Sequence, residues 1–217
     1  MNDNSVRSLD CQHPDWKEHW QKLYAENGPD SVSWYQSHPQ HSLALIEDTG
    51  IGVSASIIDI GGGAATLVDH LLKAGYRDIT VLDIARAAIQ QAQQRLGDQS
   101  QRVTWVEDDI TRNSPTRQFD IWHDRAVFHY LTVEHDRACY LDVLQKTLKP
   151  HGQAIIATFS EYGPDQCSGL EVVRYSPQTL QQALGNQLQL LETITDEHHT
   201  PDGGVQQFVY CRFSRKD

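Results

Sequence analysis

Three consecutive glycines, Gly61 to Gly63, lie between a short apolar run and a segment with helical periodicity. Backbone N–H groups of glycines can approach a ligand closely, and the following helix presents its positive N-terminal end to the same place. Asp59 precedes the glycines, and Asp83 follows Gly63 by 20 positions, the spacing at which a carboxylate holds a ribose in nucleotide-binding folds. This order of residue types predicts a site for a nucleoside; the alternative is a sharp turn that binds nothing.

The charge around this turn indicates which nucleoside to expect. A dinucleotide fingerprint needs a further glycine at the position of Thr66. The carboxylate of Asp59 would repel a pyrophosphate but attract an ammonium or sulfonium group. We therefore expect S-adenosylmethionine (SAM), and a nicotinamide-dependent oxidoreductase is the more distant alternative. A later acidic pair, Asp108 and Asp109, ends an expected strand where it could meet the adenine edge.

The elements that position these residues follow from the hydrophobic pattern. Apolar runs alternate with segments of helical periodicity, which predicts a parallel sheet with helices on both faces. The expected strands cover residues 56–60, 78–84, 102–110, 119–124 and 152–159. The expected helices cover residues 65–75, 85–97, 134–150 and 176–185. Two further strands, 187–197 and 205–213, flank a glycine-containing turn and would form an antiparallel hairpin at one edge of the sheet.

The N-terminal part of the chain has a different pattern. Trp16 and Trp20 lie at helical spacing on what would be the packing face of a first helix, and a second helix is expected after Pro39. We therefore expect a helical lid over residues 1–50 and a SAM-binding domain over residues 51–217, packed as one compact unit. The fold class is α/β, with a doubly wound, mostly parallel, seven-stranded Rossmann-like sheet and a C-terminal antiparallel hairpin.

Composition argues against several other classes of protein. The net charge of −11 disfavours nucleic-acid binding and attachment to anionic membranes. No run approaches the ~18 apolar residues of a membrane-spanning helix, and the polar start is unlike a signal peptide. The four cysteines, Cys11, Cys139, Cys167 and Cys211, form no CxxC pair, so neither a zinc site nor a disulfide framework is expected. We expect a cytoplasmic protein with no metal and no nucleic-acid or membrane partner.

Several motifs together resemble the class I SAM-dependent methyltransferases. They read DIGGGAAT, VLDI, VEDDI, FDIWHDRAVFHYL and LKPHGQAIIATF, and they span Ser56 to Phe159. The resemblance implies that Asp59, Gly61 and Gly63 hold the methionine portion of SAM and its amino group. It further implies the fold of these SAM-binding enzymes, methyl transfer as the activity, and S-adenosylhomocysteine (SAH) as the product.

The same resemblance assigns the remaining cofactor contacts to the ends of the next strands. Asp83 would hold the ribose hydroxyls, with Ile84 against the adenine. Asp109 would reach the adenine amino group, and Ile110 would offer its backbone N–H. The chain from His123 to Ala126 would lie beside the sulfonium. One departure is Ala65, which stands where the family has its third glycine.

A narrower resemblance links the chain to the thiopurine and thiol/halide methyltransferases. It rests on FDIWHDRAVFHYLTVEHDRACYLDVL and on the later FSEYGPDQCSGLEVVRYSPQTLQQALG. Those families place a tryptophan over the cofactor, which here would be Trp34 in VSWYQ. The same WYQ opening, followed by Pro39, is also similar to bacterial relatives of small protein-lysine methyltransferases.

Methyl transfer from a sulfonium needs a nucleophile held near attack distance, so the protein supplies orientation and electrostatics. A thiolate needs little acid–base help, whereas an amine or a hydroxyl needs a base. The candidate catalytic residues are His123, Asp124, Arg125 and Tyr35. For Asp124 and Arg125, a structural pairing with each other is the alternative, and for His129 a buried structural role. Trp34 and Tyr35 could be core aromatics or could contact the sulfonium through their rings.

Other reactive side chains have simpler interpretations. Cys167, with Cys211, could bind a soft substrate, but an inert thiol is the expected state. His198 and His199 in the last turn are expected to be solvated. The sequence thus predicts a SAM-dependent methyltransferase for a small-molecule acceptor with a soft, sulfur-like nucleophile. The alternatives are a protein-lysine methyltransferase and, in another class, a SAM-binding sensor without turnover.

Overall fold

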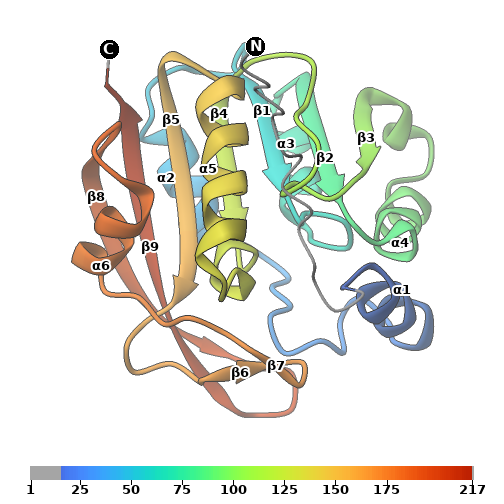
Figure 1. The fold of residues 1–217 in the computed structure, drawn as a ribbon. Helices are drawn as coiled ribbons and strands as arrows, with labels where there is room; N and C mark the ends of the chain where they lie inside the picture. The colour runs from blue at the N-terminus through green and yellow to red at the C-terminus, as the bar shows by residue number, and fades with distance from the viewer. Residues whose placement is uncertain (1–15, 217) are drawn as a thin grey trace, which may run out of the picture.

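The structure, a computed structural model, describes residues 16–216. Cys11 and the expected helix start at Pro14 lie outside these residues. Within them, seven strands form one sheet in the order β3-β2-β1-β4-β5-β9-β8 (Figure 1). The parallel strands are β1 (Ser56–Ile60), β2 (Asp78–Asp83), β3 (Val103–Glu107), β4 (Phe119–Arg125) and β5 (Leu148–Phe159). This confirms the mostly parallel Rossmann-like sheet.

The chain ends in the expected antiparallel hairpin, made by β8 (Leu188–His199) and β9 (Val205–Arg215). Strand β9 pairs antiparallel with both β5 and β8, so it lies between them and leaves β8 at the sheet edge. Its Phe208 and Tyr210 are buried on one face, and Val209 and Cys211 on the other. The apolar residues that alternate between the two faces of β9 therefore belong to a strand that is buried on both faces.

Helices cover both faces of the sheet because each inner strand is buried on both sides. Neighbouring residues of β1 show this, since Ile57 packs into one core cluster and Ile58 into the other. Helices α5 (Glu134–Thr147) and α6 (Pro177–Leu184) cover the face nearest the viewer in Figure 1, and α2 (Gln40–Glu47) and α3 (Leu67–Ala74) cover the opposite face. Helix α4 (Arg86–Leu96) packs against β2, β3 and the first helix, α1 (Trp16–Glu26).

Short elements complete the chain. They are the 3₁₀ helices η1 (Gly97–Arg102) and η2 (Phe128–Tyr130) and the two-stranded hairpin of β6 (Gln166–Cys167) and β7 (Leu170–Glu171). Residues 160–175 belong to none of the expected strands or helices, so the sequence did not predict this hairpin. It forms because Ser168 and Gly169 both adopt positive φ angles, of 52° and 75°, as a tight two-residue turn requires.

Three expected boundaries differ from the structure by three or more residues. The fifth strand begins at Leu148 rather than at residue 152, and α5 accordingly ends at Thr147. The strand continues past Pro150 because its pairing with β4 shifts register between Phe119 and Ile121, and His151 takes a positive φ of 60° there. The third strand ends at Glu107, so Asp108 and Asp109 belong to the turn that follows it.

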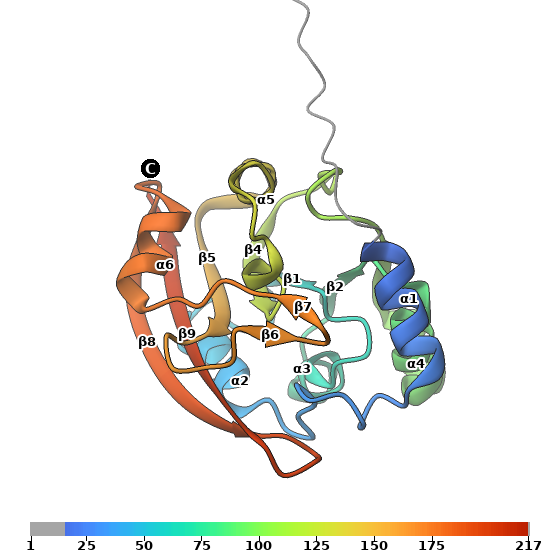
Figure 2. The ribbon, with the colours of Figure 1, turned by 60° about the horizontal axis from the view of Figure 1, so that its bottom comes forward.

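Three segments lie beyond the carboxyl ends of the parallel strands: α1, residues 27–39, and the hairpin β6–β7. Figure 2 shows α1 alongside α4 and the hairpin near the ends of β4 and β5. Backbone bonds hold the hairpin loop there, since Val173 N–H donates to the His129 carbonyl and Tyr175 N–H to the Phe159 carbonyl. We refer to residues 27–39 as the cover segment. In the part of the chain described here, no helix has the length and apolar character needed to span a membrane.

Candidate functional site

A pocket opens where the parallel strands end. The glycine turn, the ends of β2, β3 and β4, helix α1 and the cover segment all contribute to its walls. The empty space is about 1230 Å³, including open solvent at the mouth.

The glycine turn is required by close packing. Gly61 has a φ of 67°, and a Cβ built on it would lie 2.2 Å from the Val127 side chain. A Cβ on Gly63 would lie 2.6 Å from both the Ala88 Cβ and the Asp83 Oδ2. No larger residue fits at either position without displacing a neighbour. Gly61 lines the pocket, whereas Gly63 lies behind it and supports Asp83.

The spacing of 20 residues brings Gly63 and Asp83 together. The Asp83 carboxylate accepts hydrogen bonds from Gly63 N–H at 3.0 Å and from Ala85 N–H at 2.8 Å. Burial raises the pKa of Asp83 to about 6, although the two N–H groups oppose the shift. The negative charge of Asp59 adds to the increase. Asp83 is thus fixed in orientation at the pocket wall and titrates at a higher pH than an exposed aspartate.

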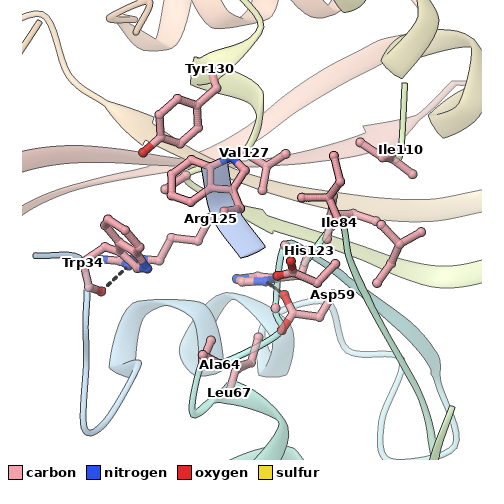
Figure 3. Close-up of a pocket in the computed structure, with 18 of the residues that line it drawn as sticks. Trp34, Asp59, Ala64, Leu67, Ile84, Ile110, His123, Arg125, Val127 and Tyr130 are labelled. Atoms are coloured by element: carbon pink, nitrogen blue, oxygen red, sulfur yellow. Dashed lines mark hydrogen bonds and ion pairs between the residues drawn. The ribbon is translucent and has the colours of Figure 1, made fainter. Parts of the chain in front are cut away.

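Asp59 and His123 face each other across β1 and β4, where they are register partners. Asp59 Oδ1 lies 2.7 Å from His123 Nδ1, and His123 Nε2 lies 2.8 Å from the Ser42 hydroxyl (Figure 3). All three residues are buried at the base of the pocket. The remaining Asp59 oxygen, Oδ2, is buried without a hydrogen-bond partner among residues 16–216. The sequence analysis missed Ser42 because no sequence pattern predicts that α2 packs beside the end of β4.

Asp124 lies behind the wall rather than in it. Its carboxylate accepts hydrogen bonds from Val127 N–H at 2.9 Å, Phe128 N–H at 3.1 Å and the Tyr140 hydroxyl at 2.6 Å. The residue is fully buried, and burial raises its pKa to about 6. The alternative in which Asp124 pairs with Arg125 was wrong, because each side chain has other partners. Asp124 fixes the turn that leaves β4.

Arg125 points along the pocket toward the cover segment (Figure 3). Its Nε donates to the Tyr210 hydroxyl and its Nη1 to the Trp34 carbonyl, both at 2.8 Å. The guanidinium stacks on Phe208, with its central carbon 4.4 Å from the ring centroid. The next residue, Ala126, has a φ of 69°, a left-handed conformation that is uncommon for alanine. The chain thus turns sharply at the point where Arg125 enters the pocket.

Aromatic rings form the side of the pocket near Arg125. Trp20 contacts Trp34 and Tyr130 edge to face, with centroid separations of 5.8 and 5.1 Å. Trp34 Nε1 donates to the Tyr24 hydroxyl at 3.3 Å. Tyr35 also lines the pocket, and so do Trp16 and Trp20. The two tryptophans of α1, expected only to pack the helix, therefore contribute to the site.

The opposite side of the pocket is formed by residues after β2 and β3. Ile84, Asp109 and Ile110 all line it, as the sequence predicted for an adenine-binding side. Asp109 Oδ1 accepts hydrogen bonds from Thr111 N–H at 2.9 Å and from the Thr111 hydroxyl at 2.7 Å. Its Oδ2 pairs with Arg112 at 3.3 Å. The structure therefore brings ten of the twelve predicted site residues to the pocket wall; Gly63 and Asp124 support it from behind.

Other reactive side chains lie outside this pocket. His129 is buried, and burial, with a smaller contribution from the charge of Arg125, lowers its pKa to about 3, so it is neutral. Cys167 is buried and does not line the pocket. The expectation that His198 is solvated was wrong, because it is buried and its Nε2 donates to the Ser33 carbonyl at 2.8 Å. Within residues 16–216, no group of three or more His, Cys, Asp and Glu side chains is placed to hold a metal ion.

Comparisons with known proteins agree with this geometry. The family described as "Methyltransferase domain" matches residues 58–154. EEF1A lysine methyltransferase 2 of Danio rerio is 24% identical over 181 residues, which cover 74% of this chain and 77% of the relative. Malonyl-[acyl-carrier protein] O-methyltransferase of Anoxybacillus flavithermus is 32% identical over 108 residues, 49% of this chain and 39% of that relative.

Among solved structures, the 1,6-didemethyltoxoflavin-N1-methyltransferase of Burkholderia thailandensis superposes with a TM-score of 0.74 at 19% identity. The alignment covers 93% of this chain and 88% of that one. That protein was crystallised with SAH and 1,6-didemethyltoxoflavin. Similar proteins thus differ in the acceptors their names specify, and this likeness in structure concerns the fold.

Proposed function

We propose that this chain transfers a methyl group from SAM to a small-molecule acceptor. Its residues 58–154 match a methyltransferase domain, and its fold is that of the class I SAM-dependent methyltransferases. SAM is the cofactor, and SAH is the product. When bound, SAM supplies an electrophilic methyl carbon, and the electron pair of the broken C–S bond remains on sulfur. The acceptor supplies the electron pair of the new bond to that carbon.

The observation that carries this proposal is the charge placed around the glycine turn. The unpartnered Oδ2 of Asp59 suits the ammonium of a methionine moiety, because a buried carboxylate oxygen is costly until it accepts a hydrogen bond. Asp83 would hold the ribose hydroxyls, as the resemblance implies. Ile84 and Ile110 would pack on the adenine, and Asp109 lies at that end of the pocket. Asp59 is held in orientation by His123, which is itself held by Ser42.

The walls of the pocket favour a small acceptor. Helix α1 and the cover segment form one side of the pocket, so an acceptor would be enclosed beside the cofactor. Enclosure excludes water and orients the nucleophile, which is where the protein contributes most to methyl transfer. We propose residues 1–50 as the part of the chain that includes this lid, over a SAM-binding domain of residues 51–217.

The arrangement of the candidate bases favours an acceptor that needs no deprotonation by the protein. Both ring nitrogens of His123 are occupied, and Asp124 is buried behind the wall. Neither is presented to a bound acceptor, and Tyr35 is the remaining candidate on the wall. A thiolate or another soft nucleophile attacks without a base. This supports a sulfur-like acceptor, in line with the predicted likeness to thiol methyltransferases.

A protein lysine is the second candidate acceptor. It is favoured by the similarity to a protein named as a lysine methyltransferase. A lysine ε-amine must lose a proton before attack, so this reaction requires a base that Tyr35 or a substrate residue would have to provide. A SAM-binding sensor without turnover is the candidate from another class. It would bind SAM in the same pocket and transfer nothing.

Radiolabelled SAM distinguishes these candidates. Purified protein is incubated with labelled SAM and separate panels of thiols, amines, halides and cell lysate, and SAH binding is measured by calorimetry. Label in a small thiol supports the proposal. Label in a protein band identifies the lysine reaction, and SAH binding without any transfer identifies a sensor. Absence of SAH binding contradicts the proposed function altogether.

A further inference from the structure

Arg125 is a cation without an anion. Its two hydrogen bonds go to neutral acceptors, the Tyr210 hydroxyl and the Trp34 carbonyl. Its third nitrogen, Nη2, has no partner among residues 16–216 and is shut off from solvent. By contrast, Arg95 and Arg212 pair with carboxylates at 2.8 and 2.7 Å. A guanidinium removed from water without a counter-charge is costly, so its position needs an explanation beyond stability.

The positive charge of Arg125 extends over the neighbouring residues. Burial lowers the pKa of both His129 and His198, and the charge of Arg125 lowers each further. The charge also acts to lower the pKa of Cys167, although burial raises that pKa overall. No carboxylate of the pocket hydrogen-bonds to Arg125. The charge of Arg125 therefore has no hydrogen-bonded counter-charge at this end of the pocket.

The pocket thus has two walls of opposite charge. Asp59, Asp83 and Asp109 form the acidic wall at the glycine turn and the ends of β2 and β3. Arg125 forms the arginine wall together with the rings of Trp34 and Tyr130. With the cofactor on the acidic wall, as proposed above, the space beside Arg125 is left for the acceptor.

We infer that the methyl acceptor carries an anionic group, a carboxylate or a phosphate, that pairs with the guanidinium of Arg125. This inference rests on the proposed function and specifies the substrate class of the same site. A guanidinium binds such groups through two parallel hydrogen bonds, and Nη1 and Nη2 supply that pair. Nη1 donates to the Trp34 carbonyl and Nη2 is buried, so pairing of both nitrogens with the anionic group would require the cover segment to move away from Arg125.

A binding experiment tests the inference without knowledge of the acceptor. Sodium acetate and inorganic phosphate are titrated into the SAH complex at constant ionic strength, with sodium chloride as the reference, and the Tm is followed. We expect one or both anions to raise the Tm of the wild type. Arg125→Gln should abolish the increase, and Arg125→Lys should retain part of it because the charge remains. Absence of any anion effect in the wild type overturns the inference.

Arg215→Gln is the matched control. Arg215 is another partly buried arginine whose hydrogen bonds go to carbonyl oxygens, those of Gln145 and Leu148, but it does not line the pocket. This variant should keep the anion effect. If it loses the effect to the same extent as Arg125→Gln, the anions act on the protein in general and the inference is wrong.

Matched acceptors provide the second test and identify the anion. Transfer of label is compared for 3-mercaptopropionate against its amide, and for 2-mercaptoethyl phosphate against 2-mercaptoethanol. We expect the anionic member of at least one pair to be preferred about 10- to 100-fold, since a hydrogen-bonded charge pair contributes about 1.5–3 kcal/mol. Arg125→Gln should remove that preference while changing SAH affinity less than about threefold. Equal rates within both pairs overturn the inference, whereas loss of SAH binding by the wild type overturns the proposed function.

Discussion

The acidic wall and the arginine wall of the pocket are built in different ways. The acidic wall is formed by residues at the ends of consecutive strands and is held by backbone N–H groups. Those of Gly63 and Ala85, for example, donate to the Asp83 carboxylate. The arginine wall combines Arg125 of β4 with the rings of Trp34 and Tyr130, and Arg125 is held by the Trp34 carbonyl and by the Tyr210 hydroxyl of β9. Backbone geometry fixes the first wall, and tertiary packing assembles the second. Substitutions should therefore separate cofactor binding from acceptor binding.

The largest expected effect is that of Gly63→Ala on the acidic wall. The added methyl group would meet Ala88 and the carboxylate that Gly63 supports, each 2.6 Å away. We expect SAH affinity to fall on the order of 100-fold and the free energy of unfolding to fall by about 2 kcal/mol, since overpacking typically costs 1–3 kcal/mol. Calorimetry and denaturant titration measure the two effects.

Gly75→Ala is the control for that substitution. Gly75 ends α3 with a φ of 98°, and a Cβ there would have nothing within 4 Å. It should cost about 1 kcal/mol through backbone strain, a Tm decrease of roughly 2–4 °C, and leave SAH affinity unchanged. A similar loss of affinity in both variants would mean that general destabilisation explains the result at Gly63.

The next effect is that of Asp83→Asn, which should weaken SAH binding about 10- to 30-fold at pH 8. Burial raises the pKa of Asp83 to about 6 in the folded protein, so the carboxylate is ionised above that pH and protonated below it. If ionised Asp83 accepts the ribose hydroxyls, wild-type affinity falls as the pH decreases through about 6, and the variant shows no such step. Calorimetry between pH 5 and 8 measures this. A wild-type profile without the step would assign the ribose contact to another group.

A smaller effect is expected for Ser42→Ala at the base of the pocket. The substitution leaves His123 Nε2 without its 2.8 Å partner, so the orientation of Asp59 becomes less defined. We expect a roughly three- to fivefold loss of SAH affinity and a proportional loss of activity. A large decrease in kcat with normal SAH affinity would instead place Ser42 in proton transfer.

The smallest effect is expected for Trp34→Phe on the arginine wall. Phenylalanine keeps an aromatic ring but loses the 3.3 Å hydrogen bond to Tyr24. We expect about a twofold change in SAH affinity and a larger, roughly threefold, increase in the KM of the acceptor. Steady-state kinetics with an acceptor from the labelled panel checks this. The reverse ranking would place Trp34 over the cofactor, as the tryptophan of the thiol methyltransferases suggests.

The same contrast explains what could be predicted from the sequence. The sheet, its C-terminal hairpin and the juxtaposition of Gly63 with Asp83 follow from local patterns, because βα units repeat one geometry and place strand ends together. The partners of Arg125 could not be predicted, since Tyr210 is 85 positions away and the Trp34 carbonyl belongs to an irregular segment. The contact of Ser42 with His123 and the burial of His198 could not be predicted for the same reason. Contacts between distant segments depend on packing that no short motif records.

The buried carboxylate of Asp124 has a consequence for the evolution of new specificities. It anchors the turn after β4 from the side of Tyr140, independently of the residues that face the pocket. Arg125 and Val127 can therefore be exchanged while the backbone of this turn stays in place. A laboratory seeking a different acceptor would randomise the pocket-lining positions of this turn and leave Asp124 unchanged.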